Sequence, residues 1–136
     1  MGKKDLIQSL GEVPLFSRCT KRELATVARH VETVELDDGT EMITEGDPGD
    51  AFFLILDGKA TVIQDGEQVA DVGPGAWFGE LALLDDRPRS ATVVAQGPIT
   101  VAVLGVRMFR TILREFPDIS ELLLAGLAGQ LRDARG

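Results

Sequence analysis

The interpretation of this chain begins from one stretch, Phe78-Gly79-Glu80-Leu81-Ala82-Leu83-Leu84-Asp85-Asp86-Arg87-Pro88-Arg89-Ser90-Ala91-Thr92. It opens with a glycine and an acidic residue, followed by an apolar run long enough for about one helical turn. The free backbone N–H groups at the start of such a turn favour an anion. Arg89 stands directly before a run that is predicted to be a strand. Its guanidinium can bind phosphate or carboxylate through two parallel hydrogen bonds.

Glu80 has the wrong charge to bind that anion, but its carboxylate can accept hydrogen bonds from neighbouring hydroxyl groups. The stretch therefore suits a phosphate next to a sugar hydroxyl. Taken singly, its features have ordinary explanations: a glutamate complements a helix dipole, an arginine is a solvated surface charge, and an apolar run is core. Their order and spacing together favour a ligand site.

The stretch resembles the phosphate-binding cassette of cyclic nucleotide-binding domains, as found in cyclic-AMP-dependent kinase regulatory subunits and catabolite-activator-type transcription factors. An upstream portion, residues 46–58, resembles the second and third strands of that family with their joining loop. The residues that carry the resemblance in the cassette are Phe78-Gly79-Glu80-Leu81-Ala82-Leu83 and Pro88-Arg89-Ser90-Ala91-Thr92.

The resemblance implies a role for each matched position. Glu80 is expected to hold the ribose 2′-hydroxyl and Arg89 the cyclic phosphate, while Gly79 lets the backbone approach the sugar closely. Backbone amides at Leu81, Ala82 and Ser90 are expected to complete the phosphate cradle. The full predicted ligand-binding set is Gly79, Glu80, Leu81, Ala82, Arg89, Ser90 and Ala91.

The ligand implied by the resemblance is a cyclic purine nucleotide rather than a cofactor. In the family, a hydroxyl residue after the cassette arginine can bond the guanine amino group, whereas alanine there accompanies adenine. Ser90 occupies this position, but bacterial cyclic-AMP receptors also carry serine there. Cyclic AMP is therefore the first expectation and cyclic GMP the alternative.

Composition is that of an ordinary globular protein, with 44% hydrophobic and 26% charged residues in a chain of 136. This length suits a single domain over residues 1–136. The net charge of −8 argues against nucleic acid or an anionic membrane as a partner. No apolar run is long enough to span a bilayer, and the N-terminus lacks a signal-peptide core, so a cytoplasmic location is expected. With one cysteine and one histidine, Cys19 and His30, neither a disulfide nor a metal cluster is expected.

Residues 1–31 have the spacing of helices. Leu6, Ile7 and Leu10 share a face before Gly11 and Pro14 interrupt it. Thr20-Lys21-Arg22-Glu23 is predicted to be a capping box, with the Thr20 hydroxyl bonded to the Glu23 amide. His30, near the end of the helix that follows, is expected to have a packing or capping role.

Residues 32–104 are predicted to form the β-roll. Three Asp-Gly pairs, at 38–39, 57–58 and 65–66, suit tight hairpin turns. Many short strands with evenly spaced turns indicate a sandwich or roll. The resemblance implies a mainly β fold, an eight-stranded jelly roll (double-stranded β-helix) with N-terminal helices and two C-terminal helices. The candidate strands are 32–36, 41–44, 51–56, 59–64, 68–72, 90–95 and 99–104.

Residues 105–136 return to a helical period. One helix is predicted to end near Phe116-Pro117, and a second to begin with Asp118 or Ser120 as its cap. The second carries a short coiled-coil-like seam, which core packing explains equally well and which would also suit a homodimer. The members of this seam are Leu124, Leu127, Leu131 and Ala134.

The second helix is also the predicted cover of the bound base. Leu123, Leu124 or Leu127 is expected to pack on the purine. Because glycine lowers helix stability, Gly126 and Gly129 should leave this helix marginal without ligand. Stiffening it with Gly126→Ala is expected to tighten nucleotide affinity.

The predicted function is a regulatory cyclic nucleotide-binding module that relays binding through its C-terminal helices, without enzymatic activity. A cupin-type metal enzyme is disfavoured because such sites need several histidine and carboxylate ligands. A degenerate roll retained for protein contacts is weakened by the presence of both Glu80 and Arg89. The effector is expected to be a separate protein partner or a domain missing from this sequence.

Overall fold

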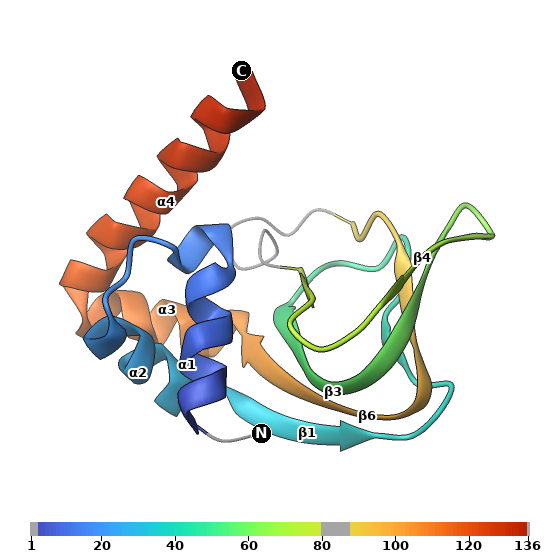
Figure 1. Ribbon diagram of the computed structural model, residues 1–136. Coiled ribbons are helices and arrows are strands. Elements are labelled where there is room, and N and C mark those ends of the chain that lie inside the picture. The colour runs from blue at the N-terminus through green and yellow to red at the C-terminus, as the bar shows by residue number, and fades with distance from the viewer. Residues whose placement is uncertain (1–2, 80–87, 136) are drawn as a thin grey trace. The chain divides into compact units, whose positions relative to one another are not determined.

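The computed structural model describes residues 3–79 and 88–135, which fall into two compact units (Figure 1). The strand unit comprises Glu32–Val106 and holds an antiparallel sheet. The helical unit comprises Met1–Val31 and Arg107–Gly136. None of the described helices combines the length and apolar character that crossing a membrane requires.

Six strands make up the sheet in the described residues. Its order is β1-β6-β3-β4, with β2 paired to β6 and β5 paired to β3. Figure 1 shows β3 and β6 as the two long, curved strands at the centre of this unit. The bounds are β1 Glu32–Leu36, β2 Glu41–Ile43, β3 Ala51–Gln64, β4 Glu67–Val72, β5 Trp77–Phe78 and β6 Thr92–Gly105.

The first predicted strand is confirmed with the same bounds, and Asp65-Gly66 does form the predicted tight turn. Both residues have positive φ, 52° and 80°, as a two-residue hairpin between β3 and β4 requires. The predicted turn at Asp57-Gly58 is wrong. There β3 continues through two shifts of register against β6, and Gly58, at φ 94°, lies against the Pro98 carbonyl.

These bends explain the strand count. The two segments expected on either side of Gly58 form one strand of 14 residues, and so do the two expected on either side of Gly97-Pro98. Because β3 and β6 bend where they face each other, their ladder of hydrogen bonds resumes beyond the bend. The described residues thus form six strands, and the expected eight-stranded count is not confirmed.

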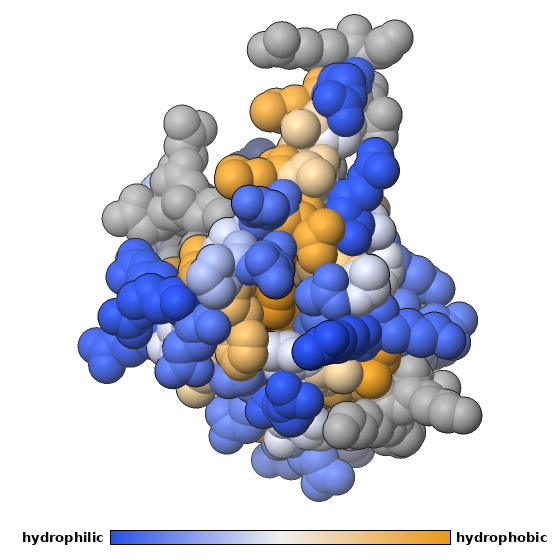
Figure 2. All heavy atoms as spheres, turned by 90° about the vertical axis from the view of Figure 1, so that its left-hand side faces the viewer, coloured by the Kyte–Doolittle hydropathy of each residue, from blue (hydrophilic) through white to orange (hydrophobic). Residues whose placement is uncertain are grey.

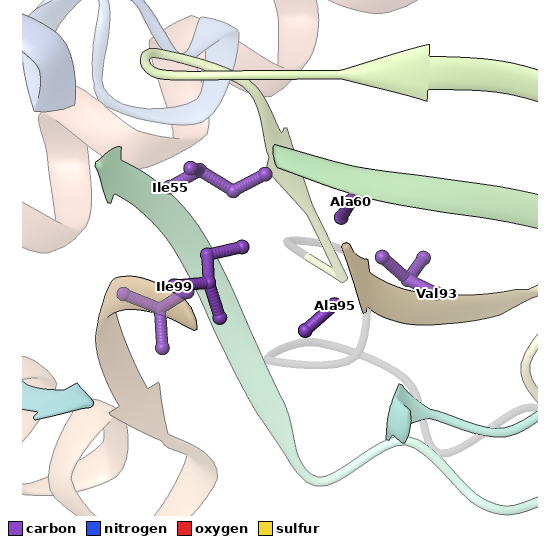
Figure 3. Packing of buried hydrophobic residues seen from close by; sticks show 6 residues of the cluster. Ile55, Ala60, Val93, Ala95 and Ile99 are labelled. Carbon is purple, nitrogen blue, oxygen red and sulfur yellow. The ribbon is translucent and has the colours of Figure 1, made fainter. Parts of the chain in front are cut away.

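The core of the strand unit is a cluster of small and β-branched side chains from β3 and β6 (Figure 3). Each is at most 2% exposed. Alternation puts residues two apart, such as Val93 and Ala95, on one side of the sheet. Ile55 and Ala60 are five residues apart, and the register of β3 against β6 shifts twice between them. The cluster is Ile55, Ala60, Val93, Ala95, Ile99 and Val101.

The helical unit is built from two segments distant in sequence. α1 (Lys3–Glu12) packs against α2 (Lys21–Arg29), and the short 3-10 helix η1 (Pro14–Phe16) contacts α4 (Pro117–Arg135). α3 spans Val106–Glu115 and precedes α4. α4 begins with a proline at its first turn, where the missing N–H costs nothing. The predicted caps Asp118 and Ser120 are therefore wrong, because both lie inside α4.

The capping box at the start of α2 is also corrected. Thr20 has the extended backbone of an N-cap, but its side chain makes no bond to a backbone N–H of the helix. Its hydroxyl donates to the Glu23 carboxylate instead. His30 has the expected packing role: its Nδ1 lies 2.7 Å from the Thr26 carbonyl, and its ring meets Phe116 edge-on at 6.1 Å.

The two units differ sharply in charge. The strand unit has 15 acidic and 3 basic residues, a net charge of −12. The helical unit has 7 acidic and 11 basic residues, a net charge of +4. The overall charge of −8 conceals this separation. An anion bound by the strand unit must therefore be attracted by a local positive group.

Candidate functional site

The backbone of Arg89 is fixed by the loop that joins β2 to β3. Its N–H donates to the Asp47 carbonyl at 2.7 Å, and its carbonyl accepts from the Gly46 N–H at 2.9 Å. The preceding residue, Pro88, forms an isolated antiparallel bridge with Pro48. Segments far apart in sequence thus set the position from which the Arg89 side chain leaves the backbone.

The guanidinium of Arg89 is half-buried at the start of β3. Its Nη2 donates to the Ala51 carbonyl at 2.7 Å. Burial lowers the pKa of the guanidinium, and the negative charge of Asp50 acts in the opposite direction. The group nevertheless remains cationic at neutral pH. Because a guanidinium has five N–H donors, the bond to Ala51 leaves others for an anion.

Gly79 lies directly against this guanidinium. It has φ 83°, and a Cβ built there would stand 2.4 Å from Arg89 Nη1 and 2.7 Å from the Ala51 carbonyl oxygen. A side chain at this position would therefore displace the arginine as well as strain the backbone. The structure gives Gly79 a second reason to be glycine, beside the close approach to a sugar that the resemblance implies.

β5 brings Gly79 to Arg89, and this strand was not among the predicted ones. Phe78 pairs with Phe53 across the ladder, and Trp77 pairs with Leu54. The rings of Phe53 and Phe78 stack with centroids 5.4 Å apart and planes 17° apart. A strand of two residues is too short for a recognisable alternation.

Two further residues of the site were also missed. The Ala51 carbonyl binds the guanidinium, and Asp50 supplies the nearby negative charge. Both lie in the portion that resembles the family, but the sequence assigned neither a role. A backbone carbonyl leaves no mark on residue type, so only the pairing of distant segments reveals it.

Only some of the other predicted ligand-binding residues lie in the part of the chain that the structure describes. Glu80, Leu81 and Ala82 lie outside the described residues, as does Arg87. Ser90 is exposed and Ala91 is half-buried in the short segment between Arg89 and β6. Beyond them, the Thr92 hydroxyl accepts a hydrogen bond from the Glu45 N–H at 2.9 Å. The structure thus brings Gly79 together with Arg89 and places Ser90 and Ala91 directly after it.

The three predicted base-covering leucines of α4 have different environments. Leu123 is 3% exposed, Leu124 is 66% exposed and Leu127 is half-buried. The expectation that Gly126→Ala would tighten nucleotide affinity assumed room for a methyl group, and the structure contradicts that assumption. A Cβ at Gly126 would lie 2.7 Å and 2.8 Å from the carbonyl oxygens of Leu15 and Pro14 in η1. Gly126 is therefore a contact between helices.

The described residues contain no group of three or more histidine, cysteine, aspartate or glutamate side chains placed to hold a metal ion. The charged feature at the candidate site is instead a single guanidinium, which suits a phosphate or carboxylate. The arrangement can bind and orient an anion.

Comparison with known proteins identifies the family of this chain. Residues 33–116 match the family model of the cyclic nucleotide-binding domain. The cAMP-dependent protein kinase regulatory subunit of Aspergillus niger is 42% identical over 112 residues, which is 81% of this chain. The chain spans 27% of that relative's length.

Solved structures give the same result. The N-terminal domain of a transcriptional regulator from Streptomyces coelicolor A3(2) superposes with a TM-score of 0.84 at 31% identity, covering 93% of this chain and 94% of that one. The regulatory domain of Toxoplasma gondii PKA, crystallised with cAMP, has a TM-score of 0.71 at 34% identity, covering 81% of this chain and 44% of that one. The chain belongs to the cyclic nucleotide-binding domain family, whose members are generally regulatory rather than catalytic.

Proposed function

We propose that this chain binds a cyclic purine nucleotide, with cyclic AMP as the first candidate and cyclic GMP as the alternative. The observation that carries the proposal is the half-buried Arg89 guanidinium, which lies on Gly79 with N–H donors not used by the Ala51 carbonyl. In a unit of net charge −12, this cation supplies the local positive charge that a phosphate needs in order to bind. The co-crystal of the Toxoplasma gondii relative with cAMP supports cyclic AMP.

In this proposal Arg89 binds the cyclic phosphate and Glu80 the ribose 2′-hydroxyl. The amides of Leu81, Ala82 and Ser90 complete the cradle, and Ala91 lines it. Two hydrogen bonds from one guanidinium to phosphate oxygens fix the orientation of the ligand as well as its affinity. The serine at position 90 leaves the guanine amino group a hydroxyl partner, so cyclic GMP is retained as the competitor.

Titration calorimetry with each nucleotide tests the proposal directly. We expect saturable binding of both, tighter for cyclic AMP, and no binding of adenosine, which lacks the phosphate. The absence of heat with either cyclic nucleotide at about millimolar concentration, at two temperatures, would favour the alternative of a roll kept for protein contacts. A preference of about tenfold for cyclic GMP that disappears in Ser90→Ala would reverse the choice of base.

The output of binding is proposed to pass through α4 to a partner protein, or to a domain outside this sequence. Leu124 is the base-covering candidate with the most exposed side chain, and Leu127 is half-buried. If α4 orders over the base, amides 122–131 should gain protection from hydrogen exchange when nucleotide is added. Unchanged protection would assign the relay to another element.

A homodimer through α4 is the proposed assembly. Figure 2 shows hydrophobic residues gathered along this helix, and two leucines one heptad apart, Leu124 and Leu131, are 66% and 62% exposed. Charge on this seam should abolish a dimer formed by it. Sedimentation of the chain and of Leu124→Glu provides the test, with Val69→Glu, exposed at 55% on β4, as the matched control.

A further inference from the structure

The outer face of α3 carries a stripe of three arginines. Arg107, Arg110 and Arg114 follow one another at spacings of three and four residues, so their side chains lie on one face of the helix. All three are exposed. The opposite face is buried, with Phe109 1% and Ile112 0% exposed. We call the three arginines the arginine stripe.

The arginine stripe has no partner within the part of the chain that the structure describes. Among the described residues, none of its three guanidinium groups makes a hydrogen bond or ion pair. Like charges three and four residues apart lower the stability of a helix. Asp118 follows Arg114 by four residues but belongs to α4, and no ion pair joins the two. The stripe thus lowers the stability of α3 with no compensating contact in the described part of the chain.

Charge and side-chain chemistry indicate what the stripe would attract. It belongs to the unit of net charge +4, in a chain of net charge −8. Its cations are all arginine, whose planar fork binds carboxylates through paired hydrogen bonds better than a lysine does. They line an open hollow of about 650 Å³, together with Thr111 and Leu113.

We propose that the arginine stripe docks a carboxylate-bearing helix of a partner protein. Along α3 the stripe places cations about 4.5 Å and 10.5 Å from the first one. A parallel partner helix with acidic residues at i, i+3 and i+7 presents carboxylates at the same intervals. In an antiparallel partner helix the matching pattern is i, i+4 and i+7. Nucleic acid fits less well, because a long polyanion also meets the field of the −12 strand unit. The proposal does not depend on nucleotide binding.

The test uses the full chain without nucleotide and a labelled, alanine-rich helical peptide with glutamates at i, i+4 and i+7. We expect binding by fluorescence anisotropy that exceeds binding of the matched glutamine peptide by at least about tenfold at low salt. The triple variant Arg107→Gln, Arg110→Gln, Arg114→Gln should lose about tenfold or more of the affinity for the glutamate peptide. Because these side chains are exposed, its circular dichroism should match that of the parent chain.

A charge-matched control separates the stripe from net charge. The triple variant Arg18→Gln, Lys21→Gln, Arg22→Gln removes three exposed cations of the same unit, and its affinity should fall by less than about threefold. Equal losses in the two triple variants, or equal binding of the glutamate and glutamine peptides, would overturn the proposal. Tighter binding of a short DNA duplex than of the glutamate peptide, lost in the stripe variant, would overturn the partner class.

Discussion

The strand unit and the helical unit have net charges of opposite sign, and each contains cations in a different setting. In the strand unit, net charge −12, the notable group is one half-buried cation, Arg89. In the helical unit, net charge +4, three exposed cations stand together on α3. A half-buried charge on a fixed backbone can bind one anion in one orientation, whereas exposed charges are weak singly and attract an anion through their number and spacing. The two units are therefore suited to different kinds of anion.

The largest effect should come from removing the isolated cation. Arg89→Ala is expected to weaken cyclic nucleotide binding by about a hundredfold or more, because each charge-assisted hydrogen bond contributes about 1.5–3 kcal/mol. Calorimetry measures the change. Lys59→Ala removes an exposed cation from the same unit and should cost little, as should Arg87→Ala. If either of these abolished binding while Arg89→Ala did not, Arg89 would be the wrong anchor.

The glycine in contact with the Arg89 guanidinium provides the next test. Gly79→Ala puts a methyl group 2.4 Å from Arg89 Nη1 in a backbone with φ 83°. We expect the free energy of unfolding to fall by about 1–3 kcal/mol and nucleotide affinity to fall with it. Gly75→Ala is the matched control, because its φ is 89° but nothing lies within 4 Å of a Cβ there. It should lose stability without losing affinity, as measured by thermal unfolding and calorimetry.

A pair of glycines in α4 tests the packing of the helical unit. Gly126→Ala meets two backbone carbonyls of η1 and should lower the free energy of unfolding by about 1–3 kcal/mol. Gly129→Ala meets nothing within 4 Å and should raise it by about 0.5–1 kcal/mol through helix propensity. Thermal unfolding should therefore move in opposite directions for the two variants. A stabilising Gly126→Ala would mean that α4 does not pack on η1.

The smallest effect concerns Cys19 in the helical unit. Burial, with a contribution from Glu23, raises the pKa of this thiol from 9.0 to about 11. Alkylation by iodoacetamide should be slow at pH 8 and rise only toward pH 11. Because the folded thiol retains its proton longer, its ionisation should lower stability as pH rises from about 9 to 11 and have no effect below that. Glu23→Gln removes the negative charge that helps to raise the pKa of Cys19, so the rise in alkylation rate should begin at a lower pH.

The sequence alone determined the acidic composition, the first strand and the alternation of helical and strand segments, and it was sufficient to propose the cassette. Each depends on residue types at short spacing: the turn at Asp65-Gly66 needs two positive φ values that a local dipeptide can supply. Arg89 could be proposed as the anchor because the order and spacing of the cassette residues favour a ligand site. Such features are encoded within a few residues of where they act.

Only the tertiary structure decided which distant segments meet. Whether β3 ends or bends at Asp57-Gly58 depends on the bend of β6 opposite it. Whether Gly126 only lowers the stability of α4 or also lets it pack on another helix depends on η1, which lies over a hundred residues earlier in the sequence. The bond from Arg89 to the Ala51 carbonyl is of the same kind. Backbone carbonyls and empty Cβ positions leave no mark on residue type, so their roles appear only when the chain brings them together.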